Sequence, residues 1–305
     1  MSEPRSLDFL CIGAPKAGTT SLFHYLRAQQ GVFMPAIKEA PYFCDDHWFA
    51  EGWTAFWNEY FQEAADHDLV GKVTPQYMGD LRVAGRIAAE MPDVKILCIL
   101  RNPIDRAFSD YRMRRRVGKE DRSFDEVVDS QSREEELRRA RAYRNGRDRP
   151  TDAYLARSEY GRLLEEFRTR FGIRRILVVF SEHLKSDPDT EVQRALHHIG
   201  SQAPLETSAL HKTFHVGGDE LRFKGLPERL RAIPPLRMVW HLIPSPVRKD
   251  VFVRFKYDWN IKKKRTSMSK ETRSRLVEFF ADDVSFLETT WSLEVPWREF
   301  SVSSR

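Results

Sequence analysis

The stretch Leu10-Cys11-Ile12-Gly13-Ala14-Pro15-Lys16-Ala17-Gly18-Thr19-Thr20-Ser21 decides the fold. It runs from an apolar strand through a glycine-containing turn into an amphipathic helix. The first backbone N–H groups of a helix have no internal partner, and the helix dipole is positive there, so an anion binds readily. Lys16 adds a cation, and the hydroxyls of residues 19–21 add further donors. The stretch therefore predicts a phosphate-binding loop.

This loop differs from the one that binds nucleoside triphosphates. Gly13 and Gly18 keep the spacing of Gly-x-x-x-x-Gly-Lys-Ser/Thr, but the lysine lies inside the loop and Thr19 stands in its place. The next strong apolar run, 95–100, ends in Arg101, where a magnesium-dependent enzyme needs an acidic residue. These differences predict a ligand with phosphate at two separated places and no required metal.

The two segments together resemble the PAPS-dependent sulfotransferases, which use 3′-phosphoadenosine-5′-phosphosulfate (PAPS) as donor, and in particular a bacterial, heparan-sulfate-sulfotransferase-like branch. Residues 15–22 look like the family's loop for the 5′-phosphosulfate, and residues 101–111 look like its 3′-phosphate segment. The resemblance implies that Arg101 and Ser109 hold the 3′-phosphate and that adenosine 3′,5′-bisphosphate is the product. It also implies a donor loop made of Lys16, Ala17, Gly18, Thr19, Thr20 and Ser21.

The hydrophobic pattern predicts an α/β fold: a P-loop-NTPase-like parallel sheet flanked by helices, with a mainly helical C-terminal part. Continuous apolar strands that alternate with helical segments are typical of a parallel sheet covered on both faces. Open sheets of this kind bind ligands at the carboxyl edge, so Lys16, Arg101 and the residues after Val73 should share one crevice. We expect strands at 7–12, 69–73, 95–100 and 175–180, and helices at 18–29, 81–90, 103–116, 154–171 and 269–288.

The chain is predicted to form a single sulfotransferase domain over residues 1–305. Its core covers about 7–200, an insertion at about 112–150 flanks the acceptor cleft in the family that the chain resembles, and a helical region follows at about 205–305. The resemblance extends through Ser158-Glu159-Tyr160 and Asp187-Pro188 and becomes weak after about residue 200.

Glu39 is the expected general base. It lies in Lys38-Glu39-Ala40-Pro41-Tyr42-Phe43, and in the heparan-type branch a Lys-Glu pair before an aromatic segment supplies a catalytic glutamate. The small-molecule branch uses histidine instead, for which His47 and His67 are the nearest residues. Closure of the site around Glu39 would raise its pKa toward the working pH. Lys16 is expected to stabilise the charge that develops on the leaving phosphate.

One segment departs from the family pattern. Relatives often carry Glu-Lys or Glu-Ala before Thr-Pro-x-Tyr, and some use that lysine near the transferred sulfuryl group, whereas this chain reads Gly71-Lys72-Val73-Thr74-Pro75-Gln76-Tyr77. Lys72 is thus displaced by one residue, onto the opposite face of an extended segment. The sequence does not establish whether Lys72 reaches the active site.

Two parts of the C-terminal region each allow two interpretations. Arg222 and Lys224 stand where relatives carry a flexible basic loop that closes over the donor, and they are equally consistent with a surface turn. Residues 226–265 combine apolar, tryptophan-containing sequence with a cluster of cations, which suits weak contact with a membrane surface. A packed helical subdomain with a basic edge has the same pattern, and we favour it.

Composition agrees with an enzyme that binds a polyanionic donor. The chain has 305 residues, is 41% hydrophobic and carries a net charge of +5. Its basic residues are mixed with acidic ones and lack interleaved aromatic residues, which argues against a nucleic-acid partner. No apolar run of about 18 residues and no signal-peptide pattern occurs, and the three cysteines lack metal spacing, so we expect a cytoplasmic protein.

The expected reaction is sulfuryl transfer from PAPS to a hydroxyl or amine of a carbohydrate-containing or other small acceptor, such as a glycan, a glycolipid or a glycosylated metabolite. Fold alone does not identify the acceptor, and the oligomeric state is not predicted. Two alternatives stay open at this point. One is a P-loop nucleotide kinase, which the displaced lysine and the missing metal carboxylate disfavour. The other is a non-catalytic protein that binds nucleotides or polyanions.

Overall fold

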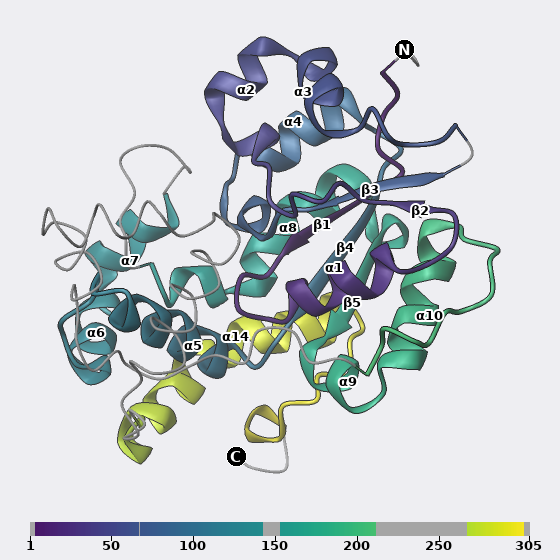
Figure 1. Cartoon of the computed structure of the whole chain (residues 1–305). Coiled ribbons are helices and arrows are strands. Elements are labelled where there is room, and N and C mark those ends of the chain that lie inside the picture. The colour runs from purple at the N-terminus through teal and green to yellow at the C-terminus, as the bar shows by residue number, and fades with distance from the viewer. Residues whose placement is uncertain (1–3, 67, 143–152, 212–266, 302–305) are drawn as a thin grey trace, which may run out of the picture.

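The computed structural model describes residues 4–66, 68–142, 153–211 and 267–301 (Figure 1). Five parallel strands form one sheet in the order β2-β3-β1-β4-β5. The parallel sheet predicted from the sequence is confirmed. The strands are β1 (Phe9–Gly13), β2 (Val32–Phe33), β3 (Leu69–Val73), β4 (Lys95–Leu100) and β5 (Ile176–Phe180).

Four of these strands match the expected ones to within two residues at each end, and β3 and β4 match them fully. The edge strand β2 was not expected, because its two residues are too few to show a hydrophobic pattern.

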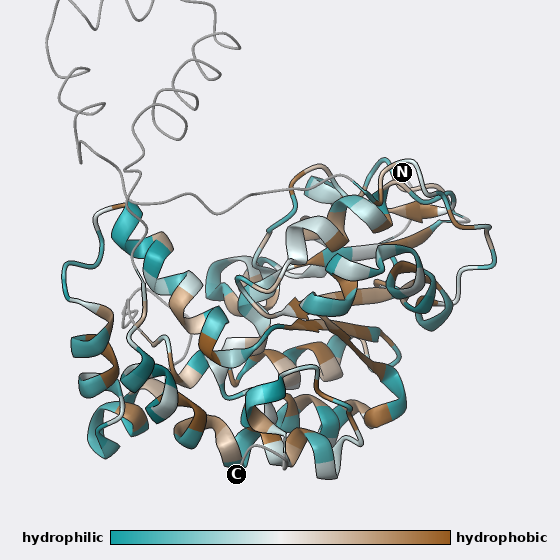
Figure 2. Cartoon of the chain, turned by 90° about the horizontal axis from the view of Figure 1, so that it is seen from below, coloured by the Kyte–Doolittle hydropathy of each residue, from teal (hydrophilic) through white to brown (hydrophobic). Residues whose placement is uncertain are grey.

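Helices cover both faces of the sheet, with α1, α9 and α10 on one side and α4 and α8 on the other (Figure 1). Figure 2 shows apolar residues gathered on the strands and on the inner faces of the helices. The helices are α1 (Thr19–Arg27), α2 (Asp46–Glu51), α3 (Trp53–Tyr60), α4 (Val83–Glu90), α5 (Pro103–Arg116), α6 (Phe124–Gln131), α7 (Glu134–Arg141), α8 (Tyr160–Phe171), α9 (Ser181–Ser186), α10 (Pro188–Ile199) and α14 (Lys270–Thr290).

The helix expected over 154–171 is divided. A 3₁₀ turn, Ala156–Ser158, precedes α8, which begins at Tyr160. Arg106 contacts this break, since its buried guanidinium donates to the Tyr154 carbonyl at 2.6 Å and to the Ser158 hydroxyl at 2.7 Å.

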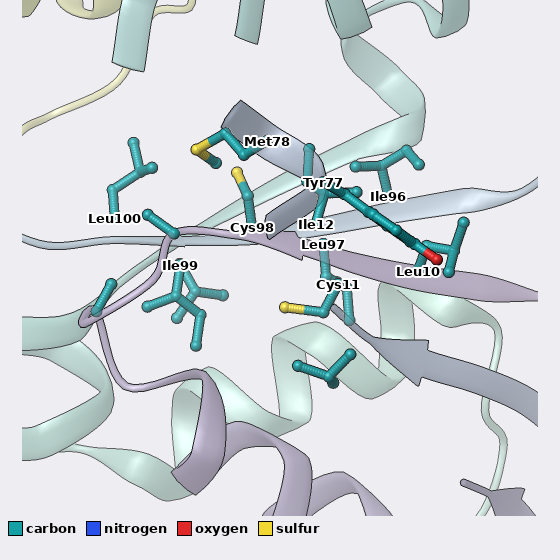
Figure 3. Close-up of a cluster of buried hydrophobic side chains, with 14 of the residues drawn as sticks. Leu10, Cys11, Ile12, Tyr77, Met78, Ile96, Leu97, Cys98, Ile99 and Leu100 are labelled. Carbon is teal, nitrogen blue, oxygen red and sulfur yellow. The ribbon is translucent and has the colours of Figure 1, made fainter. Parts of the chain in front are cut away.

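The two central strands form the core of the sheet. Leu10, Cys11 and Ile12 of β1 lie beside residues 96–100 of β4, and all of these side chains are buried (Figure 3). Tyr77 and Met78 pack on this surface from the short turn that follows β3. Cys11 and Cys98 are free, buried thiols, as expected of core cysteines.

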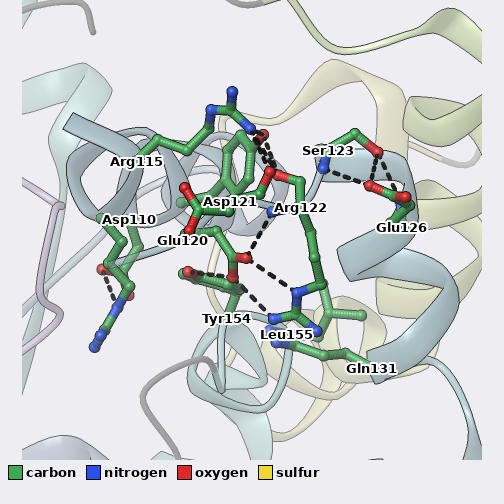
Figure 4. Close-up of polar contacts among 12 residues, drawn as sticks. Asp110, Arg115, Glu120, Asp121, Arg122, Ser123, Glu126, Gln131, Tyr154 and Leu155 are labelled. Atoms are coloured by element: carbon green, nitrogen blue, oxygen red, sulfur yellow. Dashed lines mark hydrogen bonds and ion pairs between the residues drawn. The ribbon is translucent and has the colours of Figure 1, made fainter. Parts of the chain in front are cut away.

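The insertion after α5 is held by local polar contacts (Figure 4). The Arg122 guanidinium donates to both oxygens of the Glu120 carboxylate, with nitrogen–oxygen distances of 3.0 and 2.8 Å. The Tyr154 hydroxyl donates to the same carboxylate at 3.1 Å. Ser123 and Glu126 form a capping box at the start of α6. The insertion therefore combines contacts within its own turns with ion pairs to other elements, Arg275 to Asp129 at 2.7 Å and Arg141 to Glu159.

The helical C-terminal part is confirmed by α14, which packs against α8 and α5. Ser269 caps it by accepting from the Thr272 N–H at 3.0 Å. Trp297 then returns to the sheet, with its ring centroid 5.5 Å from that of Phe180. None of the helices in the described ranges combines the length and the apolar composition needed to cross a bilayer. Arg222, Lys224, residues 226–265 and His67 lie outside the described residues.

Candidate active site

The predicted phosphate loop connects the end of β1 at Gly13 to the start of α1 at Thr19. Lys16 and Gly18 both have left-handed backbone conformations, with φ of 71° and 104°. Alternation of right- and left-handed residues turns successive N–H groups toward one side and makes an anion-binding concavity. Within the described residues, no side chain caps the N-terminus of α1. The N–H groups of Thr19 and Thr20 are therefore available to an anion, while the Ser21 N–H donates to the Gly18 carbonyl at 3.0 Å.

The Lys16 ammonium faces α5. Its Nζ lies 3.6 Å from the sulfur of Met113, which is a weak acceptor. Burial lowers the pKa of Lys16, the Asp110 carboxylate opposes this effect, and the charges of Arg116 and Arg101 add to it. A partly desolvated ammonium that finds no strong acceptor among the described residues has much to gain from an incoming anion.

Arg101 connects the end of β4 to the loop. One guanidinium nitrogen donates to the Lys16 carbonyl at 3.3 Å, and the Arg101 carbonyl accepts from the Tyr160 hydroxyl at 2.9 Å. Asn102 caps α5, because its side-chain oxygen accepts from the N–H groups of residues 104 and 105 at 3.0 and 3.2 Å. Ser109 lies half-buried on the same helix. The two segments predicted to hold separate phosphates therefore meet at the carboxyl edge of the sheet.

Glu39 lies beside the start of α1. Lys38 makes the connection, since its Nζ is 2.7 Å from a Glu39 oxygen and 3.4 Å from the Thr19 hydroxyl. The Gln76 amide donates to the other carboxylate oxygen at 2.6 Å. The Glu39 side chain keeps 42% of its surface exposed, so an acceptor group can approach it.

The electrostatics of Glu39 differ from the expectation of a raised pKa. Burial raises the pKa of the carboxyl group, but hydrogen bonds from Lys38 and Gln76, together with the charges of Lys38 and Lys16, outweigh burial. The pKa of Glu39 therefore lies below its ordinary value, and the group is a carboxylate at neutral pH. The expected rise on closure concerns a closed state and stays a prediction.

Sequence reasoning missed two contacts of Glu39. Lys38 was named only as part of the motif, although its position next to Glu39 could have suggested an ion pair. Gln76 belongs to the segment Thr74-Pro75-Gln76-Tyr77, and no local signal indicates that it reaches a residue 37 positions away.

The alternative bases are placed differently. His47 lies on α2, with its side chain 77% exposed and Nδ1 3.4 Å from a Glu51 oxygen. Among the described residues, His47 pairs with Glu51 and makes no polar contact with the donor loop. His67 is outside the described residues.

Lys72 is buried, 2% exposed, and its ammonium donates to the Ile37 carbonyl. It thus lies beneath the segment that carries Glu39. Its ammonium contacts the backbone of that segment, and its charge interacts with the Glu39 carboxylate.

Comparison with known proteins agrees with this geometry. The family model described as "Sulfotransferase domain" matches residues 6–216. Human heparan sulfate glucosamine 3-O-sulfotransferase 6 is 29% identical over 193 residues, covering 63% of this chain and 51% of that protein. The membrane-associated sulfotransferase kil1 of Dictyostelium discoideum is 31% identical over 106 residues, covering 34% of this chain and 22% of that protein. The chain thus spans about half or less of the length of these two relatives.

Among solved structures, a sulfotransferase from Alicyclobacillus acidocaldarius superposes with a TM-score of 0.64 at 23% identity, covering 95% of this chain and 98% of that one. This similarity shows a shared fold. The family match extends over more than half of the residues and includes the loop, Arg101 and the Glu39 segment. The chain therefore belongs to the sulfotransferase family.

Proposed function

We propose that this protein transfers a sulfuryl group from PAPS to a hydroxyl or amine of a carbohydrate-containing or other small acceptor, with Glu39 as general base. One observation carries the proposal: Lys38 bridges Glu39 and Thr19, with distances of 2.7 and 3.4 Å. A carboxylate is thereby held at the first residue of the helix that follows the anion loop. A base next to a bound donor is what sulfuryl transfer to an O–H or N–H group needs.

The residues of the loop and of α5 suit the two phosphates of the donor. Residues 16–21 would bind the 5′-phosphosulfate through the Lys16 ammonium, the N–H groups at the start of α1 and the hydroxyls of residues 19–21, while Arg101 and Ser109 would hold the 3′-phosphate. Lys16 is placed to stabilise charge on the leaving oxygen, where a preorganised cation lowers the barrier. Neither of these roles requires a metal ion.

In the proposed step, Glu39 accepts the proton of the acceptor O–H or N–H while that oxygen or nitrogen forms a bond to sulfur. The bond between sulfur and the bridging oxygen breaks, and its electron pair stays on the phosphate of adenosine 3′,5′-bisphosphate. Lys16 faces this developing charge. Because the donor is already activated, the protein contributes mainly position and electrostatics.

The relatives support a carbohydrate as the class of acceptor. The curated relatives include several heparan sulfate glucosamine 3-O-sulfotransferases, and we propose a saccharide hydroxyl as the first acceptor to test. Such an acceptor would reach Glu39 from the exposed side of its carboxylate.

Two measurements test the function. Isothermal titration with adenosine 3′,5′-bisphosphate, with and without magnesium, should show tight binding that does not depend on the metal, and ATP should bind more weakly. A screen with sulfur-labelled PAPS over heparan sulfate oligosaccharides, glycolipids and small glycosides should transfer label to at least one acceptor. Preference for ATP with magnesium would support a kinase instead, and bisphosphate binding without any transfer would support a non-catalytic protein.

A further inference from the structure

Lys72 occupies an unusual place for a charged side chain. It lies in β3, paired in register with Leu10 of the central strand β1, and is 2% exposed. Its ammonium donates to the Ile37 carbonyl and lies 5.0 and 5.9 Å from the ring centroids of Tyr60 and Phe61. Two aromatic faces and one carbonyl are the surroundings that the described residues give this cation.

Such a site costs free energy. An ammonium has three N–H donors, and the described surroundings offer one oxygen acceptor, with the ring faces supplying weaker attraction. Burial lowers the pKa of Lys72 to about 7, and the Glu39 carboxylate opposes this effect. Methionine has nearly the same length and would fill the space without this cost, since replacing a buried charge by an apolar side chain is often neutral or stabilising. Global stability therefore does not explain a lysine at this position.

The segment that Lys72 contacts lacks an anchor of its own at its start. The Ile37 side chain is 57% exposed, so burial of this side chain does not fix residue 37. What fixes the segment 37–40 is β3 and the turn after it. Lys72 holds the carbonyl of residue 37, and Gln76 holds the Glu39 carboxylate at 2.6 Å. The hydroxyls of Thr74 and Tyr77 donate to the Ala40 carbonyl at 3.4 and 3.3 Å.

We propose that Lys72 is a positioning residue, whose buried ammonium fixes the Ile37 carbonyl and thereby sets the place of Glu39 beside the donor loop. This proposal rests on the proposed function, because it gives Lys72 a purpose only if Glu39 must be held in place. The other three contacts hold the segment at residues 39 and 40. Without Lys72, the backbone of residue 37 would lose this hydrogen bond directly before Lys38, the residue that joins Glu39 to Thr19.

The test compares Lys72→Met with Lys95→Met, which removes a lysine from the first residue of the neighbouring strand β4. In Lys72→Met we expect release of adenosine 3′,5′-bisphosphate from PAPS to slow by about 10- to 100-fold, since small misplacements of a reacting group cost about this much. The dissociation constant for the bisphosphate should stay within about twofold, and Tm should be unchanged or higher. The acid limb of the kcat/KM profile should move to higher pH, because a cation near the carboxylate is lost. Lys95→Met should change none of these.

A second readout does not depend on catalysis. Backbone amides of residues 38–42 should exchange hydrogen faster in Lys72→Met than in the wild type or in Lys95→Met. Lys72→Gln, which keeps an N–H donor on a shorter side chain, should recover part of the protection and part of the turnover, and it serves if the methionine variant does not fold.

The outcomes separate cleanly. Parallel losses of Tm, bisphosphate affinity and turnover would show that Lys72 is merely structural and would overturn the proposal, as would unchanged exchange at residues 38–42. A wild type that never releases bisphosphate from PAPS would refute the proposed function, whereas the exchange experiment would still decide whether Lys72 fixes the segment.

Discussion

The donor loop and the Glu39 segment meet at the same edge of the sheet but are held in different ways. The loop is fixed mainly through backbone groups: the Ala14 N–H donates to the Ile99 carbonyl of β4 at 2.7 Å, and the Ala17 N–H to the Ala14 carbonyl at 3.2 Å, with one added bond from the Arg101 side chain to the Lys16 carbonyl. The segment 37–40 is fixed by side chains of β3 and the following turn. One region depends on glycine conformations and the other on individual functional groups.

Because the two regions are held differently, we expect substitutions in them to affect donor binding and turnover differently. Backbone N–H groups persist when side chains change, so single substitutions around the loop should weaken donor binding by limited amounts. Substitutions in or beneath the Glu39 segment should leave donor binding intact and reduce turnover. We therefore expect two classes of variant, those that mainly weaken donor binding and those that mainly reduce turnover.

Glu39→Gln should have the largest effect. It keeps the shape and removes the basicity, so turnover should fall by roughly 10²–10⁴-fold while bisphosphate affinity stays nearly unchanged. Because the pKa of Glu39 is below its ordinary value, the wild-type acid limb of kcat/KM should lie below the pH at which a free glutamate titrates. Activity is lost as pH falls through that pKa, and the limb should flatten in the variant. Steady-state kinetics across pH measures both.

Glu51→Gln is a matched control, since Glu51 pairs with His47 on the surface of α2. Its kinetics should equal those of the wild type. If Glu39→Gln retained most of its activity while His47→Asn or His67→Asn abolished turnover with bisphosphate binding intact, a histidine would be the base and the comparison between the two regions would have to be redrawn.

Lys16→Ala should have the second largest effect, because Lys16 lies in the donor loop and its charge is proposed to stabilise the leaving phosphate. Turnover should fall by about 10²–10³-fold, more than donor binding weakens, since its stabilisation is realised mainly in the transition state. Arginine should rescue poorly because its planar fork differs from a compact ammonium. The pKa of Lys16 is lowered by burial, so kcat should decline on the alkaline side at a lower pH than an exposed lysine would give. A variant with normal turnover and only a raised KM for PAPS would make Lys16 a binding residue.

The two regions also differ in how far sequence predicts them. The loop, Arg101 and the start of α5 could be predicted because a local motif specifies the backbone that binds anions, and α5 has the expected bounds. The contact between Gln76 and Glu39 could not, because it depends on the register of β3 and on the reach of a side chain. The same limit applies to the pKa of Glu39, which its neighbours lower against the effect of burial.

The fold shows a similar division. Long apolar strands were predicted to within two residues, whereas α2, α3, α6, α7, α9 and α10 were not among the expected helices. The short helices α2 and α3 pack through aromatic contacts, such as Trp48 with Phe56 at 5.6 Å between ring centroids, and such contacts leave no clear period in the sequence. The break before α8 is contacted by Arg106, which comes from another helix.

Arg101→Ala tests the donor side with an intermediate effect. The guanidinium would make charge-assisted hydrogen bonds to the 3′-phosphate, so its loss should weaken bisphosphate binding by about 1.5–3 kcal/mol. Adenosine 5′-phosphosulfate lacks that phosphate and should bind the variant and the wild type alike. Because Arg101 also donates to the Lys16 carbonyl at 3.3 Å, equal losses for both nucleotides would show that its main task is to support the loop. Titration calorimetry with the two nucleotides decides between these roles.

Ser109→Ala should have the smallest effect and gives the finest test of the comparison. Ser109 lies half-buried on α5, two turns from the cap at Asn102, and its hydroxyl would donate one neutral hydrogen bond to the 3′-phosphate. Its removal should weaken bisphosphate binding by about 0.5–1.5 kcal/mol, with turnover at saturating PAPS unchanged. Thr169→Ala, which removes an exposed hydroxyl bonded to the Glu165 carbonyl on α8, is the matched control and should leave both quantities unaltered. A fall in turnover without a change in affinity would show that Ser109 acts in the reaction and not in donor binding. The proposed distinction between a binding region and a catalytic region would then not hold for Ser109.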